Sequence, residues 1–231
     1  MSLWGEKNTR PERGGSPFGP GEASDLVLPP SQDGLHVPGA SRKSQGIRSL
    51  FDHLSRYSGL RILDLGMLSQ GTVRYLGGLG HRINFVSLIH SFDVARARSL
   101  NADGGFSADL ASRIVRMELE FPPDSFDAVL AWDVLQHLDR AAMRSAIAQL
   151  SRIVRPNGVI FCLFHGDASK GPIPYFNCGI DSTSTISIRE VGRRHASQEF
   201  SPRRLETLFP QFRAVHLYLK RDALLEVLVI C

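Results

Sequence analysis

Two ionisable side chains four residues apart, Asp133 and His137, have the types and spacing for proton-transfer chemistry. They directly follow an apolar run, residues 126–132, and a spacing of four places both on one face if the chain winds into a helical turn. The carboxylate would then orient the imidazole as a general base. The alternative is that Asp133 caps a helix and His137 lies at the protein surface.

A second candidate group follows another apolar run, residues 60–65. Asp64 ends this run, and Gly66 forms a turn in which backbone without a side chain can approach a ligand closely. Ligands of open α/β sheets bind outside the carboxyl ends of the strands, so residues just after each strand become candidates. The alternative interpretation is that these positions are ordinary turn and core residues without a ligand.

Three segments in order carry a family resemblance: Arg61-Ile62-Leu63-Asp64-Leu65-Gly66, residues 125–135, and residues 150–160 with their Pro156-Asn157-Gly158 turn. Together they resemble the motifs of class I S-adenosylmethionine-dependent methyltransferases. The glycine motif is degenerate, because Met67-Leu68-Ser69-Gln70 stands where the family has further glycines, and the next glycine is Gly71. The family's carboxylate for the ribose is also missing at the end of the second strand, where Ser87 stands.

The resemblance implies S-adenosylmethionine as cofactor and a set of cofactor-binding residues. Trp132 would bound the sulfonium pocket with its aromatic face, although tryptophan is equally common in cores. The full set follows four predicted strands: Asp64, Gly66, Met67, Ser69 and Gly71 after the first, Ser87 and Leu88 after the second, Glu118 and Leu119 near the third, and Trp132 at the end of the fourth.

Strand and helix patterns alternate along the chain, which indicates a parallel sheet covered on both faces. With the resemblance, we expect an α/β fold: a doubly wound, Rossmann-like sheet of seven strands, mostly parallel, with a C-terminal antiparallel hairpin. Helices are predicted after Ser44, over 71–79, after Asp93, after the N-cap Asp139, and from Ser201 to Leu208. Strands are predicted at residues 60–65, 83–88, 113–117, 126–132, 159–164, 212–219 and 224–230.

Composition divides the 231 residues into a leader at residues 1–40 and a methyltransferase-like domain at residues 41–231. The leader is rich in Gly, Pro and Ser without a period, and we expect it to be disordered. Residues 165–199 are too long for a simple connection and predict a substrate-side insertion or lid. No long apolar run or signal peptide is present, so we expect a cytoplasmic protein without membrane contact.

Metal and nucleic acid are the less favoured partners. The three cysteines form no metal-binding pair, and His165 with Asp167 supplies two candidate ligands without a third, so no metal site is expected. A net charge of +4 is modest. Arg193, Arg194 and His195, with Arg203 and Arg204, could bind phosphates, but a solvated basic face is the simpler interpretation.

The function expected from the sequence is transfer of a methyl group from S-adenosylmethionine to an unidentified acceptor, most simply a small molecule. Such a transfer depends mainly on proximity and alignment, so it requires little or no general base. The degenerate glycine motif leaves a second interpretation open, a non-catalytic binding or scaffold protein of the same fold. An NAD-dependent dehydrogenase fits less well, because the glycine fingerprint of that class is more completely absent. The oligomeric state has no signal in the sequence.

Overall fold

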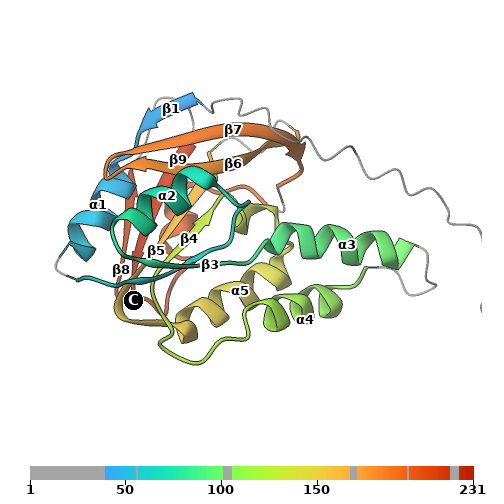
Figure 1. Cartoon of the computed structure of the whole chain (residues 1–231). Helices are drawn as coiled ribbons and strands as arrows, with labels where there is room; N and C mark the ends of the chain where they lie inside the picture. Colours follow the sequence, from blue (N-terminus) through green and yellow to red (C-terminus); the bar gives the residue numbers. More distant parts are fainter. Residues whose placement is uncertain (1–39, 56, 101–105, 167–170, 197, 219–223) are drawn as a thin grey trace, which may run out of the picture. The chain divides into compact units, whose positions relative to one another are not determined.

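A computed structural model describes residues 40–55, 57–100, 106–166, 171–196, 198–218 and 224–231 (Figure 1). The helices are α1 (Gln45–Leu54), α2 (Gln70–Gly78), α3 (Leu88–Leu100), α4 (Ala108–Glu118), the 3₁₀ turn Leu135–His137, α5 (Arg140–Ile153) and α6 (Pro202–Glu206). The strands are β1 (Ala40–Lys43), β2 (Arg61–Asp64), β3 (Arg82–Phe85), β4 (Phe126–Trp132), β5 (Val154–His165), β6 (Ile173–Ser182), β7 (Thr185–Arg194), β8 (Ala214–Tyr218) and β9 (Leu224–Ile230).

The main sheet has six strands in the order β3-β2-β4-β5-β9-β8. Strands β3, β2, β4 and β5 are parallel, whereas β9 pairs antiparallel with both β5 and β8. The predicted α/β class, the doubly wound parallel sheet and the C-terminal antiparallel hairpin are therefore confirmed. The predicted number of seven strands is one too high.

Alternate residues of the central strands build two separate cores, one on each face of the sheet. On β2, Leu63 packs into the core beneath α3, α4 and α5, while Ile62 packs into the core beneath α1 and α2. Figure 1 shows the same division, with α3, α4 and α5 grouped away from α1 and α2. Because both faces are covered, the strands are continuous apolar runs, and every residue of β4 is buried.

The strand predicted at residues 113–117 is wrong, because these residues lie in helix α4. Ser107 caps this helix: its hydroxyl accepts a hydrogen bond from the backbone N–H of Leu110 at 3.1 Å. The apolar residues Ala111 and Val115 are four apart and both fully buried, so the helix buries one continuous face. The sheet consequently lacks the seventh strand and ends at β3.

The predicted insertion at residues 165–199 contains a long hairpin, β6 and β7. Strand β1 pairs with β7, which makes a second, antiparallel sheet in the order β1-β7-β6. Cys178 and Ile180 of β6 and Ile186 of β7 are buried in the core that contains α1 and α2. This hairpin is therefore packed against the domain through apolar side chains. Figure 1 shows β6 running alongside α2.

Several local predictions can be compared directly with the structure. Asp139 caps α5 by accepting hydrogen bonds from two backbone N–H groups at 2.8 Å, as predicted, and Ser201 caps α6. The second predicted strand is shorter than expected, since β3 ends at Phe85 and α3 already begins at Leu88. The predicted leader and Asp167 lie outside the described residues. Within the described part of the chain, no helix is long and apolar enough to cross a membrane.

The helical state of α4 can be tested at its exposed residue Arg113. Arg113→Pro should lower the free energy of unfolding by about 3 kcal/mol or more, since proline removes a helical hydrogen bond and clashes with the preceding turn. Arg113→Ala is the matched control and should be nearly neutral. Urea denaturation of both variants measures the difference. Equal stability of the two variants would contradict the helix, because an edge strand tolerates proline.

Candidate functional site

The candidate site lies where the carboxyl ends of β2 and β4 meet. These two strands are parallel neighbours, and the N–H of Leu65 donates a hydrogen bond to the carbonyl of Leu130 at 3.0 Å. The chain leaves β2 towards β3 on one side and has β4 on the other, which makes this the point where strand order switches direction. Ligands of doubly wound sheets bind at such a point.

One carboxylate oxygen, Oδ1 of Asp64, brings Asp64, Gly66 and Trp132 together here. Asp64 Oδ1 accepts a hydrogen bond from the backbone N–H of Gly66 at 2.9 Å and another from the indole Nε1 of Trp132 at 2.8 Å. The first bond closes the turn after β2, and the second ties that turn to the last residue of β4. Three residues predicted to bind cofactor are thus neighbours in the structure.

Burial changes the acidity of Asp64, whose residue surface is 0% exposed. Burial raises the pKa of this carboxyl from 3.8 to about 7, because the charged form loses its hydration. The hydrogen bonds from Gly66 and Trp132 act in the opposite direction, since they stabilise the carboxylate. Asp64 Oδ2 has no hydrogen-bond partner among the described residues. The site therefore contains a carboxyl that changes charge near neutral pH.

The indole of Trp132 fills the space beside Gly66. A Cβ added to Gly66 would lie 2.6 Å from Trp132 Cδ1, so only glycine fits there with the indole in this position. Trp132 has a φ of 46°, in the left-handed region that bulky side chains disfavour. Its ring also meets the edge of Phe161, with centroids 5.7 Å apart, and the residue is 1% exposed. Trp132 is a core residue in this conformation, and no open aromatic face is presented to a ligand.

The N-terminus of α2 is covered by strand β6. Ser69 caps α2 by accepting from the N–H of Thr72 at 3.3 Å, and Thr72 Oγ1 in turn accepts from the N–H of Ile180 at 3.0 Å. A Cβ added to Gly179 would lie 2.5 Å from Ser69 Oγ, and one added to Gly71 would lie 3.9 Å from the carbonyl oxygen of Ile180. Ser69 and Gly71, both predicted to bind cofactor, thus lie next to β6, where Ser69 is partly buried and Gly71 is exposed.

Asp133 and His137 are close, as the hypothesis of a helical turn requires. His137 Nε2 lies 3.4 Å from Asp133 Oδ2, and the two side chains are 0% and 1% exposed. The alternative that His137 lies at the surface is therefore wrong. Asp133 Oδ2 also accepts a hydrogen bond from the backbone N–H of Phe176 at 2.9 Å, and the ring of Tyr175 meets that of His137 at 5.3 Å.

A second imidazole belongs to the same region. The ring of His165 at the end of β5 stacks on Phe176 with centroids 5.4 Å apart. Burial lowers the pKa of His165, while the nearby carboxylate of Asp133 raises it. Gln136 Oε1 accepts from the backbone N–H of His165 at 2.8 Å and so holds the end of β5 against the 3₁₀ turn. Among the described residues, no group of three or more His, Cys, Asp or Glu could hold a metal ion.

The other predicted cofactor residues are not gathered around Trp132. Leu88 and Leu119 are fully buried in the core under α3, α4 and α5, whereas Trp132 belongs to the core on the opposite face. Glu118 accepts a hydrogen bond from Ser91 Oγ at 2.7 Å, Ser87 is exposed, and Met67 is half-buried. The assignment of Glu118 and Leu119 depended on a strand at residues 113–117, and those residues form helix α4.

Sequence reasoning missed three residues that shape the site: Thr72, Gln136 and Gly179. Thr72 and Gln136 act through hydrogen bonds to residues 108 and 29 positions away, and no local pattern marks such partners. Gly179 did carry a signal, because a glycine inside a strand often marks a close approach by other groups.

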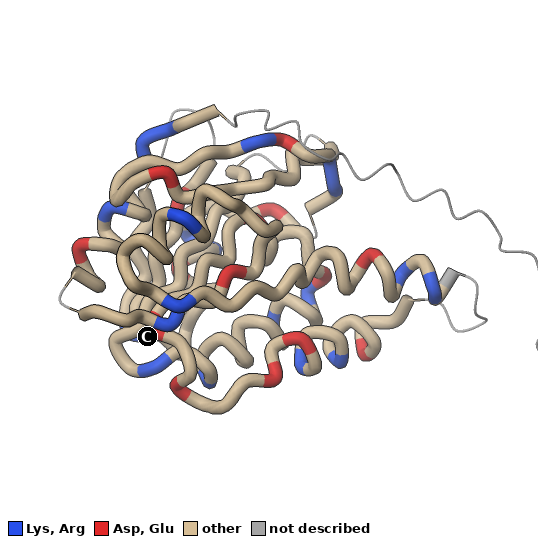
Figure 2. Tube along the Cα trace, in the orientation of Figure 1, with Lys and Arg blue, Asp and Glu red and all other residues tan. Residues whose placement is uncertain are grey.

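Charged groups outside this region offer little support for a nucleic-acid site. Arg194 forms an ion pair with Asp93 and lies over the ring of Tyr175, and Arg193 lies 3.8 Å from Glu190. Figure 2 shows acidic residues interspersed with basic ones along the described trace. Arg193 and Arg194, which were weighed as phosphate-binding residues and not favoured, thus have partners within the domain.

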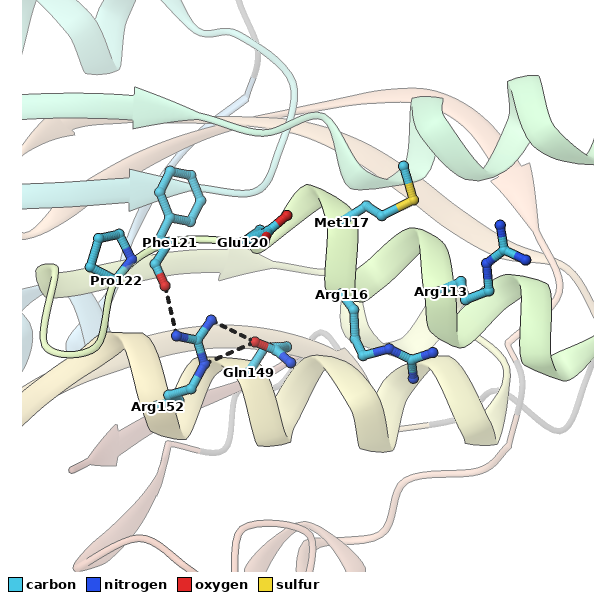
Figure 3. Close-up of a pocket in the computed structure, with 8 residues that line it drawn as sticks. All are labelled: Arg113, Arg116, Met117, Glu120, Phe121, Pro122, Gln149 and Arg152. Carbon is cyan, nitrogen blue, oxygen red and sulfur yellow. Dashed lines mark hydrogen bonds between the residues drawn. The ribbon is translucent and has the colours of Figure 1, made fainter.

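A groove between α4 and α5 lies apart from the candidate site. Its lining includes Arg113, Arg116 and Arg152, and the guanidinium of Arg152 donates to Gln149 Oε1 and to the carbonyl of Phe121 (Figure 3). None of the predicted site residues belongs to this lining. The groove therefore does not take part in the chemistry considered for the ends of β2 and β4.

A family model matches part of the chain. Residues 63–162 match the model described as a methyltransferase domain, a segment that includes the end of β2, all of β4 and most of β5. The match contains Asp64, Gly66, Trp132, Asp133 and His137. The resemblance to class I methyltransferases found in the sequence is thus confirmed over this segment. No curated protein is similar enough to this chain to count as a match.

Solved structures with a similar fold include three methyltransferases. The 1,6-didemethyltoxoflavin-N1-methyltransferase of Burkholderia thailandensis, with bound 1,6-didemethyltoxoflavin and S-adenosylhomocysteine, is 18% identical over 80% of this chain and 76% of its own, with a TM-score of 0.44. A methyltransferase of Methanosarcina mazei is 16% identical over 75% and 93%, with a TM-score of 0.43. One of Mesorhizobium loti is 16% identical over 79% and 96%, with a TM-score of 0.44. At this level of similarity, none of them says what this chain binds.

The pKa of Asp64 predicts a pH dependence of stability. Between pH 3.8 and about 7 the folded protein keeps a proton on Asp64 that the unfolded chain has lost. The free energy of unfolding should therefore fall as pH rises through this window, by roughly 1.4 kcal/mol per pH unit from this group. Asp64→Asn should lack that component, because the amide oxygen can still accept both hydrogen bonds while no charge forms. Urea denaturation at several pH values measures both curves, and parallel curves would refute the assignment.

The contact between β6 and α2 predicts a cost for Gly179→Ala. The new Cβ would press on Ser69 Oγ, which cannot move freely because it caps α2, so we expect a loss of about 1–3 kcal/mol of stability. Gly77→Ala within α2 is the control: nothing lies within 4 Å of its Cβ position, so it should stabilise by about 0.5–1 kcal/mol. In a double-mutant cycle, Ser69→Ala should recover part of the Gly179→Ala loss. If the stability changes of the two single substitutions simply add in the double mutant, Ser69 and the new Cβ at position 179 do not touch.

Proposed function

We propose that this chain is an S-adenosylmethionine-dependent methyltransferase that acts on a small-molecule acceptor. The observation that supports it most is the turn formed by Asp64 and Gly66 at the carboxyl end of β2, directly beside the end of β4. This turn lies inside the segment that matches the methyltransferase family model. S-adenosylmethionine would supply a methyl group on a sulfonium, which a nucleophilic acceptor displaces.

The residues at the proposed cofactor site fit the cofactor only in part. The turn at Gly66 and the buried, unpartnered Oδ2 of Asp64 are features that a polar ligand could use. The indole of Trp132, however, occupies the space beside Gly66, and Gly179 of β6 lies directly against Ser69, whereas Gly71 stays exposed. In the conformation described here, the methionine half of the cofactor would collide with Trp132. Binding therefore requires this side chain to move.

Asp133 and His137 would act on the acceptor. The carboxylate of Asp133 orients the imidazole, which could take a proton from an acceptor hydroxyl or amino group as the methyl group arrives. His137 Nδ1 is buried without a partner among the described residues, so it is the atom left to meet an acceptor. The separation of 3.4 Å is long for a hydrogen bond and would have to shorten in a productive complex.

Coverage of the site by β6 supports a small acceptor. Tyr175 and Phe176 lie over His137 and His165, which leaves no broad surface on which a macromolecule could present an acceptor group. An acceptor small enough to reach His137 past these rings is most compatible with that arrangement.

A second candidate function is a methyltransferase-fold protein that does not catalyse. The specific observation in its favour is the buried indole of Trp132, which completes a packed core where the cofactor would bind. If that packing is permanent, the fold would serve as a binding or scaffold module.

Titration calorimetry separates the two candidates. We expect micromolar binding of S-adenosylmethionine and S-adenosylhomocysteine and no binding of NADH, which serves as the control nucleotide. Absence of binding to both adenosyl compounds, in protein whose circular dichroism shows a folded state, would favour the scaffold candidate.

The role of His137 is tested separately from cofactor binding. His137→Ala should reduce turnover in an acceptor screen by about 10²-fold or more, the usual size of a general-base contribution, while cofactor affinity stays unchanged. His216→Ala is the matched control, because His216 is exposed on β8 and takes no part in the proposed chemistry. Full activity of His137→Ala would show that alignment alone suffices.

A further inference from the structure

We propose that Trp132 is a gate of the cofactor site, held shut by Asp64 and latched by strand β6. This inference rests on the proposed function and adds a regulation of the same site. In this view the structure described here is the closed state, and cofactor binding selects an open state in which the indole has left Gly66.

The indole of Trp132 lies in the space beside Gly66. The indole reaches from the end of β4 back to the end of β2, where Nε1 donates to Asp64 Oδ1 and Cδ1 lies 2.6 Å from the Cβ position of Gly66. The glycine that permits close approach by a ligand is thus approached by the protein's own side chain. Ligand and indole compete for one space, so they exclude each other.

The backbone of Trp132 is strained. Trp132 has a φ of 46°, an unfavourable conformation for a residue with a Cβ, and such conformations persist only where the surroundings impose them. The hydrogen bond to Asp64 and the edge contact with Phe161 hold the residue there. Relaxation to a negative φ would turn the Cα–Cβ bond and swing the indole away from Gly66.

Strand β6 acts as the latch that keeps the indole in place. The indole shares its core with Cys178 and Ile180 of β6, so it can leave only if β6 lifts. Two hydrogen bonds hold β6 in place. The backbone N–H of Phe176 donates to Asp133 Oδ2, and that of Ile180 donates to Thr72 Oγ1. Both acceptors are side chains, one directly after β4 and one on α2, rather than partners in a β ladder, so lifting β6 leaves both sheets paired.

A gate of this kind lowers the apparent affinity for cofactor in proportion to the fraction of open protein. Removing the indole should therefore raise the affinity, whereas truncating a core aromatic on the other face of the sheet should not. This expectation is the opposite of what an ordinary binding residue would give, since loss of a contact weakens binding.

Fluorescence reports the gate without any need for turnover. The chain has two tryptophans, Trp4 and Trp132, so Trp4→Phe leaves Trp132 as the only one. Saturating S-adenosylhomocysteine should shift the emission of Trp4→Phe protein to longer wavelength and increase its quenching by acrylamide, since the indole leaves a buried site. This experiment changes no residue that the structure describes.

Affinity is then compared by calorimetry in three variants. Trp132→Leu should bind S-adenosylhomocysteine at least about tenfold more tightly than the parent, because the ring no longer fills the site. Trp132→Phe keeps an aromatic ring but loses the hydrogen bond to Asp64, and serves where the leucine variant does not fold. Phe126→Leu is the control, since Phe126 is a buried aromatic of the same strand on the other face, and it should leave affinity unchanged.

The results separate the gate from the proposed function. Tighter binding by the Trp132 variants together with the emission change supports the gate, and where the parent binds too weakly to be saturated, measurable binding by the Trp132 variants alone supports it. Equal affinity of parent and variants with unchanged emission overturns the gate and leaves the proposed function standing. No binding by parent or variants, all folded by circular dichroism, overturns both.

Discussion

The arrangement of the site depends on one buried oxygen, Asp64 Oδ1, which accepts hydrogen bonds from both Gly66 and Trp132. The first bond shapes the turn after β2, and the second fixes the left-handed end of β4. Since these strands are neighbours at the switch in strand order, one carboxylate determines how both strand ends are presented. Its burial raises the pKa to about 7, so the group that organises the site is also costly to ionise.

Much of the fold could be predicted from the sequence, because burial on both faces leaves continuous apolar runs at β2, β4 and β5, and polar caps such as Asp139 mark helix starts. The failure at residues 113–117 has a local cause. Ile114 and Val115 are β-branched and favour a strand, but the Ser107 cap and the spacing of Ala111 and Val115 suit a helix. Packing of α4 on the helical core decided between these two signals.

The candidate site could be predicted only where it follows directly from strand ends. Asp64, Gly66 and Trp132 come together because they terminate two adjacent strands, and Asp133 and His137 because a single turn separates them. The cover supplied by β6 could not be predicted: Phe176 meets Asp133 and Ile180 meets Thr72 across 43 and 108 residues. No periodicity encodes such contacts, which arise only once the hairpin packs against α2 and the core beneath it.

Asp133 links the cover to the proposed chemistry. Its Oδ2 is shared between the N–H of Phe176, at 2.9 Å, and the imidazole of His137, at 3.4 Å. The shorter contact belongs to the hairpin, so in the closed state the carboxylate serves mainly to hold β6. If β6 lifts, Phe176 withdraws its N–H, and a buried carboxylate then needs another donor because an unpaired charge is costly. His137 is the donor already beside it. Opening of the hairpin and orientation of the imidazole are therefore coupled through one carboxylate oxygen.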